Sequence, residues 1–231
     1  MGASLPTGTA PAAQRDWGEF FRTHAREVGY GAAAVAIVVV AVWLYVTSEQ
    51  RKQLFAAQAL TQARAEADAG NLPLAANDLT RLIERYGGTR AGDDAAILLN
   101  DVLLLQGQTA VAVQNLQKFV GESHSKEALA SGWSLLGNGL ESQRKFKDAA
   151  AAYRKVADVA PHDFLRAQGL LDAGRVLTIS GDSAGARAAY TAVLQKYGEL
   201  AQAAEARVRL GELGVTTTPA DKPKSDATSK G

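Results

Sequence analysis

The sequence predicts an all-α protein in which one N-terminal transmembrane helix precedes a solenoid of about four helix–turn–helix units and a C-terminal capping helix. Two observations predict this fold class: an uncharged apolar run near the N-terminus, and a later pattern of glycine, alanine and large apolar residues that repeats every 37 positions. The 231 residues are 47% hydrophobic and 21% charged, a composition that supports a packed core.

The apolar run over residues 28–48 carries no charged side chain. At a rise of about 1.5 Å per residue, some 20 helical residues cross a hydrocarbon layer of about 30 Å. Tyr30 near one end and Trp43 with Tyr45 near the other suit the headgroup level, where amphipathic rings gather. A cleaved signal peptide is disfavoured because no small-x-small cleavage site follows the run. We therefore expect an uncleaved transmembrane helix over residues 28–48.

The residues ahead of the span fall into two expected segments. Residues 1–14 are small and polar and contain proline and glycine, so we expect them to be disordered. Residues 15–27 form a predicted juxtamembrane amphipathic helix, in which Trp17, Phe20 and Phe21 lie on the membrane surface and lead into the span.

The basic residues around the span indicate its orientation. Arg15, Arg22 and Arg26 precede the span, whereas Arg51 and Lys52 follow it closely. Because cytoplasmic flanks carry the excess of positive charge, this count favours a cytoplasmic N-terminus. The rest of the chain then lies across the inner membrane, in the periplasm if the host is a Gram-negative bacterium. The opposite orientation would make the chain an N-anchored cytosolic receptor.

A 37-residue register organises residues 54–213. Glycine occupies the predicted turn between paired helices at Gly70, Gly107 and Gly181, and the remaining turn falls on Arg144. Alanine stands five positions after each turn, and large residues stand nine and twelve positions after it. These residues are Ala75, Ala112, Ala149 and Ala186; Leu79, Leu116, Tyr153 and Tyr190; and Leu82, Phe119, Val156 and Val193. Since apolar residues also recur at helical spacing on both sides of each turn, each unit is predicted to be a helix pair that crosses closely at the alanine.

The register divides the solenoid into four units and a cap. The units lie near residues 56–92, 93–129, 130–166 and 167–200. A last helix over residues 201–213 has a polar outer side, as the cap of a solenoid requires, and Gly214 is expected to end it. Residues 214–231 are rich in polar residues and proline, so we expect a disordered tail.

The third unit carries the fullest set of signature residues. They are Trp133, Leu136, Gly137, Leu140, Ala149, Tyr153 and Pro161. This pattern resembles the tetratricopeptide (TPR) repeat, a helix pair that stacks into solenoids. The fourth unit keeps Leu170, Gly174, Leu177, Ala186 and Tyr190, while the first two units are more degenerate. The resemblance implies a TPR α-solenoid that serves protein–protein interaction.

The layout of the whole chain resembles single-span inner-membrane proteins with a periplasmic TPR domain, of which the YfgM-type ancillary subunit of the Sec translocon is an example. The resemblance covers about residues 15–213 and lies in the aromatic approach to the span, the Trp43 and Tyr45 exit, and the direct passage into a degenerate first repeat. It implies a role in protein transport, with SecYEG translocon subunits, a periplasmic chaperone or exported polypeptides as partners.

A second resemblance gives an alternative within the same fold. The segment LIERYG, residues 82–87, looks like the helix ends of TPR scaffolds of outer-membrane and envelope assembly. Those scaffolds are tethered through an N-terminal lipidated cysteine, and this chain has no cysteine.

Several function classes are disfavoured by the residues present. Without cysteine the chain has no disulfide, thiolate nucleophile or zinc–thiolate site. Its three histidines, His24, His124 and His162, stand far apart and show no metal-ligand spacing. The glycines of Gly137-Asn138-Gly139 lie inside a predicted helix, unlike those of a dinucleotide-binding loop. A net charge of +1 without a basic cluster gives no nucleic-acid footprint. We therefore predict a protein that is not an enzyme and that takes no cofactor or metal.

The first helices of the units are predicted to line a concave binding groove. A polar row consists of Arg64, Asp101, Asn138 and Arg175, and a mostly apolar row consists of Leu60, Ile97, Ser134 and Leu171; in each row the residues are 37 positions apart. A polar row beside an apolar row suits an extended or helical peptide, so these eight residues form the predicted partner-binding site. The alternative is that the polar members are only solvated and the apolar ones contact neighbouring helices.

The span offers a third kind of contact. Gly29, Ala32, Ala33 and Ala36 recur at three- and four-residue spacing, and small residues let transmembrane helices approach closely. The span can therefore support a homo- or hetero-oligomer.

Overall fold

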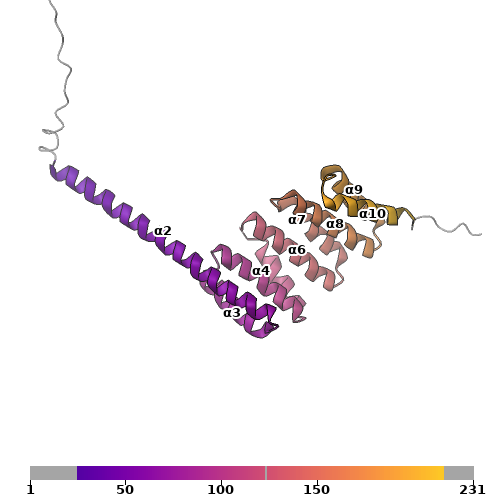
Figure 1. The fold of residues 1–231 in the computed structure, drawn as a ribbon, viewed down its shortest axis with the longest axis horizontal. Coiled ribbons are helices and arrows are strands. Elements are labelled where there is room, and N and C mark those ends of the chain that lie inside the picture. The colour runs from indigo at the N-terminus through magenta and orange to yellow at the C-terminus, as the bar shows by residue number, and fades with distance from the viewer. Residues whose placement is uncertain (1–24, 123, 216–231) are drawn as a thin grey trace, which may run out of the picture. The chain divides into compact units, whose positions relative to one another are not determined.

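The computed structural model describes residues 25–122 and 124–215, and these residues contain helices and turns but no strand (Figure 1). The helices are α2 (Ala25–Asp68), α3 (Leu72–Tyr86), α4 (Arg90–Leu105), α5 (Thr109–Phe119), α6 (Lys126–Ser142), α7 (Phe146–Val159), α8 (Asp163–Ile179), α9 (Ser183–Lys196) and α10 (Ala201–Val215). The predicted all-α fold is confirmed. The expected N-terminal segment over residues 1–14, nearly all of the expected amphipathic helix and nearly all of the expected tail lie outside the described residues.

The chain divides into two compact units, Met1–Arg51 and Lys52–Gly231. In the first unit, α2 carries an 18-residue window of mean hydropathy 1.7 in which no residue is buried, so the helix is long and apolar enough to cross a membrane. Tyr30, Trp43 and Tyr45 are all exposed, as membrane-facing side chains of a single span must be. Helix α2 extends beyond the expected span at both ends. On the C-terminal side, the residues from 49 to 68 include neither glycine nor proline and hence no helix breaker.

In the second unit, the four turns between paired helices share one geometry. Gly70, Gly107 and Gly181 have φ of 82°, 75° and 82°, and Arg144 has φ of 59°. At every turn the amide of this residue donates to the carbonyl three positions back, and the next amide donates to the carbonyl five positions back, with N···O distances of 2.8–3.1 Å. This is the Schellman arrangement, which needs a left-handed residue and therefore favours glycine. Among the described residues, Arg144 is the non-glycine residue with positive φ. The 37-residue register therefore located this turn correctly, although glycine does not occupy it.

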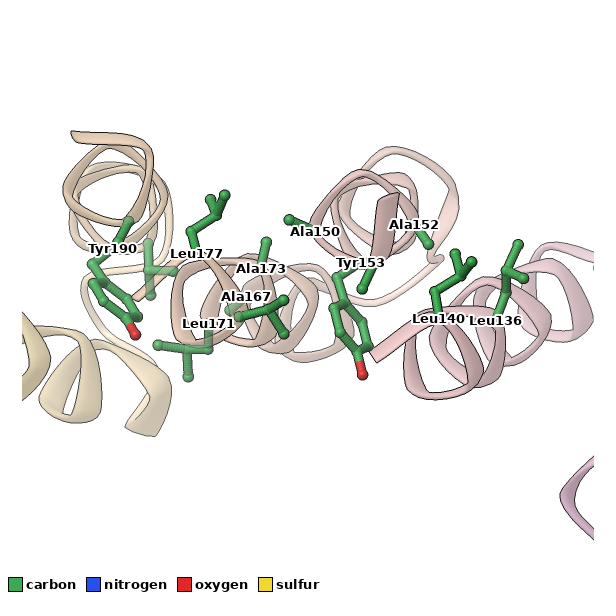
Figure 2. Packing of buried hydrophobic residues seen from close by; sticks show 14 of the residues in the cluster. Leu136, Leu140, Ala150, Ala152, Tyr153, Ala167, Leu171, Ala173, Leu177 and Tyr190 are labelled. Atoms are coloured by element: carbon green, nitrogen blue, oxygen red, sulfur yellow. The ribbon is translucent and has the colours of Figure 1, made fainter. Parts of the chain in front are cut away.

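The repeated alanines and large residues form the core, as the register predicted. Ala75, Ala112, Ala149 and Ala186 are 0% exposed, and the large residues nine and twelve positions after each turn are all buried. Figure 2 shows the rings of Tyr153 and Tyr190 in equivalent places, with both hydroxyl groups pointing the same way. The core is therefore built from one pattern used again in each unit.

Two glycines receive these tyrosine rings. A Cβ atom at Gly137 would lie 2.5 Å from Cε1 of Tyr153, and a Cβ atom at Gly174 would lie 2.5 Å from Cε1 of Tyr190. Any side chain there would push the ring away, so glycine permits the close approach of α6 to α7 and of α8 to α9. Gly137, one of the signature residues of the third unit, is therefore a packing position.

The end of the last helix differs from the sequence-based expectation. Helix α10 continues through Gly214 to Val215. A glycine weakens a helix interior by only about 1 kcal/mol relative to alanine, and it ends a helix only where the backbone turns left-handed.

We predict that Ala149→Leu destabilises the protein by about 1–3 kcal/mol, because the larger side chain has no space between α6 and α7. Ala149 is fully buried, whereas Ala151 on the same helix is exposed. Ala151→Leu is therefore the matched control and should leave the unfolding midpoint in denaturant within error of the parent. Equal midpoints for both variants would show that Ala149 does not limit the approach of these helices.

Candidate partner-binding groove

Helices α4, α6 and α8, the first helices of consecutive units, line an open hollow of about 450 Å³, which we call the groove. Helix α4 contributes Asp94, Ile97, Leu98 and Asp101, and α6 contributes Ser131, Ser134, Leu135 and Asn138, each 37 positions later. Helix α8 contributes Leu165, Gln168, Gly169 and Asp172. On each helix these residues are spaced by three or four positions, so they form one stripe along one face.

Five of the eight predicted site residues line the groove: Arg64, Ile97, Asp101, Ser134 and Asn138. Ile97 and Ser134 are half-buried, while Arg64, Asp101 and Asn138 are exposed. All five contribute to the lining of this one hollow. Their role in binding remains a prediction.

The other three predicted residues do not line the groove, and the prediction of their position was wrong. Leu60 is 8% exposed and packs in the core with residues of α3 and α4. Leu171 is 3% exposed and packs in the core of the third and fourth units. Arg175 lies one turn beyond Asp172 and lines a separate hollow of about 330 Å³ near α9 and α10.

A polar network beside the groove connects α6, α7 and α8. Both Nη atoms of Arg175 donate to Glu141, at 2.6 and 2.8 Å, and the hydroxyl of Tyr153 donates to Oδ1 of Asn138 at 2.5 Å and lies 3.3 Å from Oε2 of Glu141. The hydrogen bonds and charge of Arg175 lower the pKa of Glu141 despite its partial burial. Burial and the nearby Glu141 and Asp172 carboxylates raise the pKa of Tyr153. The network fixes Asn138 at the groove edge and joins the third unit to the fourth.

Sequence reasoning missed two acidic residues of this region, Glu141 and Asp172. The residues 37 positions before and after Glu141 are Leu104 and Thr178, so no repeated chemistry marks it. Asp172 likewise follows Leu98 and Leu135 in the register. A periodic pattern identifies what units share, and both acids are departures from it.

The groove is acidic. Three carboxylates line it, those of Asp94, Asp101 and Asp172, against the single guanidinium of Arg64. Within residues 25–122 and 124–215, no group of three or more histidine, aspartate or glutamate side chains is arranged to hold a metal ion. The chemistry that this lining offers is hydrogen bonding, charge pairing and apolar contact.

We predict that Glu141→Gln lowers stability by about 1 kcal/mol at pH 7, a modest value because the pair with Arg175 is partly exposed. Since the folded-state pKa of Glu141 lies below its ordinary 4.5, its stabilisation is present above that pH and is lost as the pH falls through the folded-state value. The difference between the parent and Glu141→Gln in denaturant unfolding should therefore vanish in acid. The control is Glu84→Gln, at an exposed position of α3. If the stability difference between the parent and Glu141→Gln does not change with pH, the Glu141–Arg175 ion pair is not its source.

Known proteins with related sequences or structures share this architecture. No curated protein matches the chain. A TPR protein from Parabacteroides merdae superimposes with a TM-score of 0.54 at 11% identity over 70% of this chain, which spans 60% of that protein's length. The nearly identical TPR-like repeats from Podospora anserina superimpose with a TM-score of 0.53 at 15% identity, over 68% of this chain and 83% of theirs. The profile of the tetratricopeptide repeat-like domain family matches residues 18–215, and the chain therefore belongs to that family.

Proposed function

We propose that this protein is a membrane-anchored TPR adaptor that holds a segment of a partner protein in the groove between α4, α6 and α8. The TPR-like fold is of a kind that mediates protein–protein interaction. The observation that carries the proposal is the open hollow of about 450 Å³, in which apolar and polar side chains of three consecutive units lie together. Such a surface offers hydrogen-bonding side chains and apolar contacts to an extended or helical segment.

We further propose that the adaptor serves protein export at the inner membrane, with its solenoid in the periplasm. The apolar part of α2 and the basic residues ahead of it support this placement. The resemblance to YfgM-type subunits supports translocon subunits, a periplasmic chaperone or exported polypeptides as partners. Envelope assembly is the second candidate, on the resemblance of the segment 82–87 to assembly scaffolds.

The groove is tested by filling it. Ser131 and Ser142 are both exposed serines of α6, but only Ser131 lines the groove. We predict that Ser131→Trp reduces partner capture by photo-crosslinking in native membranes at least about tenfold, the equivalent of one lost apolar contact. Ser142→Trp should capture like the parent, and both variants should keep the parent's helicity.

Mass spectrometry of the captured proteins separates the two candidates. Translocon subunits together with a periplasmic chaperone support the export role, whereas barrel-assembly components favour envelope assembly. Undiminished capture by folded Ser131→Trp would move the binding site away from the groove.

The proposed orientation predicts that alkaline phosphatase fused to the C-terminus is active, because this enzyme folds only after export. A cytoplasmic fluorescent reporter fused at the same point should stay dark when it is exported unfolded through the Sec route. An inactive phosphatase beside a bright reporter would place the solenoid in the cytoplasm and leave an N-anchored cytosolic receptor as the better description.

A further inference from the structure

Asp172 departs from the repeat at the point where the groove is otherwise apolar. The residues 37 and 74 positions earlier are Leu135 and Leu98, which line the same hollow from α6 and α4. The fourth unit therefore places a carboxylate where two preceding units place leucine. The side chain of Asp172 is only 25% exposed, so this is a partly desolvated acid and not a solvated surface charge.

The contacts around Asp172 leave its charge incompletely compensated. Nε2 of Gln168 lies 3.2 Å from one carboxylate oxygen, and Nε of Arg175 lies 3.8 Å from the other. Arg175 directs both of its Nη atoms to Glu141. Burial accordingly raises the pKa of Asp172 above its ordinary 3.8, while the neighbouring Glu141 has a lowered pKa. A cation entering from the groove would supply the missing partner.

The opposite wall of the groove reinforces the negative potential. Asp94 and Asp101 stand seven residues apart on one face of α4, about 10 Å along the helix. Within the part of the chain that the structure describes, neither has an ion-pair partner within 4 Å. Between the acidic walls, α6 presents only uncharged residues, among them Leu135. The groove thus combines acidic walls with an apolar and hydroxyl-bearing floor.

We propose that the groove recognises a partner segment that carries a lysine or arginine next to an apolar residue, with the basic side chain at Asp172 and the apolar one over Leu135 and Leu165. This inference rests on the proposed groove function and gives the chemistry of the partner. The complementary charge fixes which residue of the segment sits at α8, because a desolvated carboxylate discriminates strongly against an uncharged or acidic side chain. An acidic segment would add like charge to three carboxylates, against the single guanidinium of Arg64, and is disfavoured.

The test is selection of binders from a random dodecapeptide library on the purified full-length protein in detergent. With the parent we expect one position enriched in lysine and arginine by at least about fivefold over the library, a typical yield of one favourable charge contact. Asp172→Asn should remove this enrichment, and Asp172→Lys should replace it with aspartate and glutamate. The control is Glu84→Gln, which changes the net charge as Asp172→Asn does but at an exposed position of α3 outside the groove. It should select the same peptides as the parent.

The outcomes separate this inference from the groove function. In one outcome, Ser131→Trp abolishes binding, but the peptides selected on Asp172→Asn still carry the basic residue. This result would overturn the role of Asp172 and leave the groove function intact. No binders, or binders indifferent to Ser131→Trp, would overturn both. Binders that appear only after residues 216–231 are deleted would show that the chain's own lysine-containing tail occupies the groove, which also overturns the inference.

Discussion

The close contact between the two helices of each unit is the constraint on which the rest of this structure depends. At Ala75, Ala112, Ala149 and Ala186 the second helix offers only a methyl group, and all four are fully buried. At Gly137 and Gly174 the first helix offers none, and a tyrosine ring fills the space. Because interiors pack at crystal-like density, these small residues set how far apart the helices stand. The same spacing in each unit lets the first helices line up on one side.

The turns determine how helix pairs with this interhelical spacing stack to form a concave surface. Each turn uses one left-handed residue and the same two backbone hydrogen bonds, so every helix pair leaves its turn in the same geometry. Identical pairs stacked one on another place the stripes of α4 and α6 in equivalent positions, residue for residue. The groove is therefore a product of repetition, and its shape follows from residues that do not touch it.

Because the groove depends on repetition, the positions that follow the 37-residue register could be predicted from the sequence. The turn at Arg144 was found without its glycine, because three neighbouring registers predicted it. Arg64, Asp101 and Asn138 were placed on the concave side for the same reason. Leu171 was misplaced, because it packs in the core, although its register partners Ile97 and Ser134 line the groove. Whether a repeated position is buried or faces the groove depends on the contacts that its helix makes with its neighbours, and a single-residue period does not record these contacts.

The two acids that the register could not find have opposite effects at the joint between the third and fourth units. Glu141 and Asp172 lie near the same arginine, yet Arg175 gives Glu141 two short hydrogen bonds and approaches Asp172 only at 3.8 Å. The first carboxylate therefore stabilises the joint between units, and its pKa is lowered. The second is partly desolvated with a raised pKa, and so costs stability at neutral pH that leucine would not cost. The rationale that we propose for a carboxylate at a position where its register partners are leucines lies outside the folded chain, in the basic side chain of a partner segment.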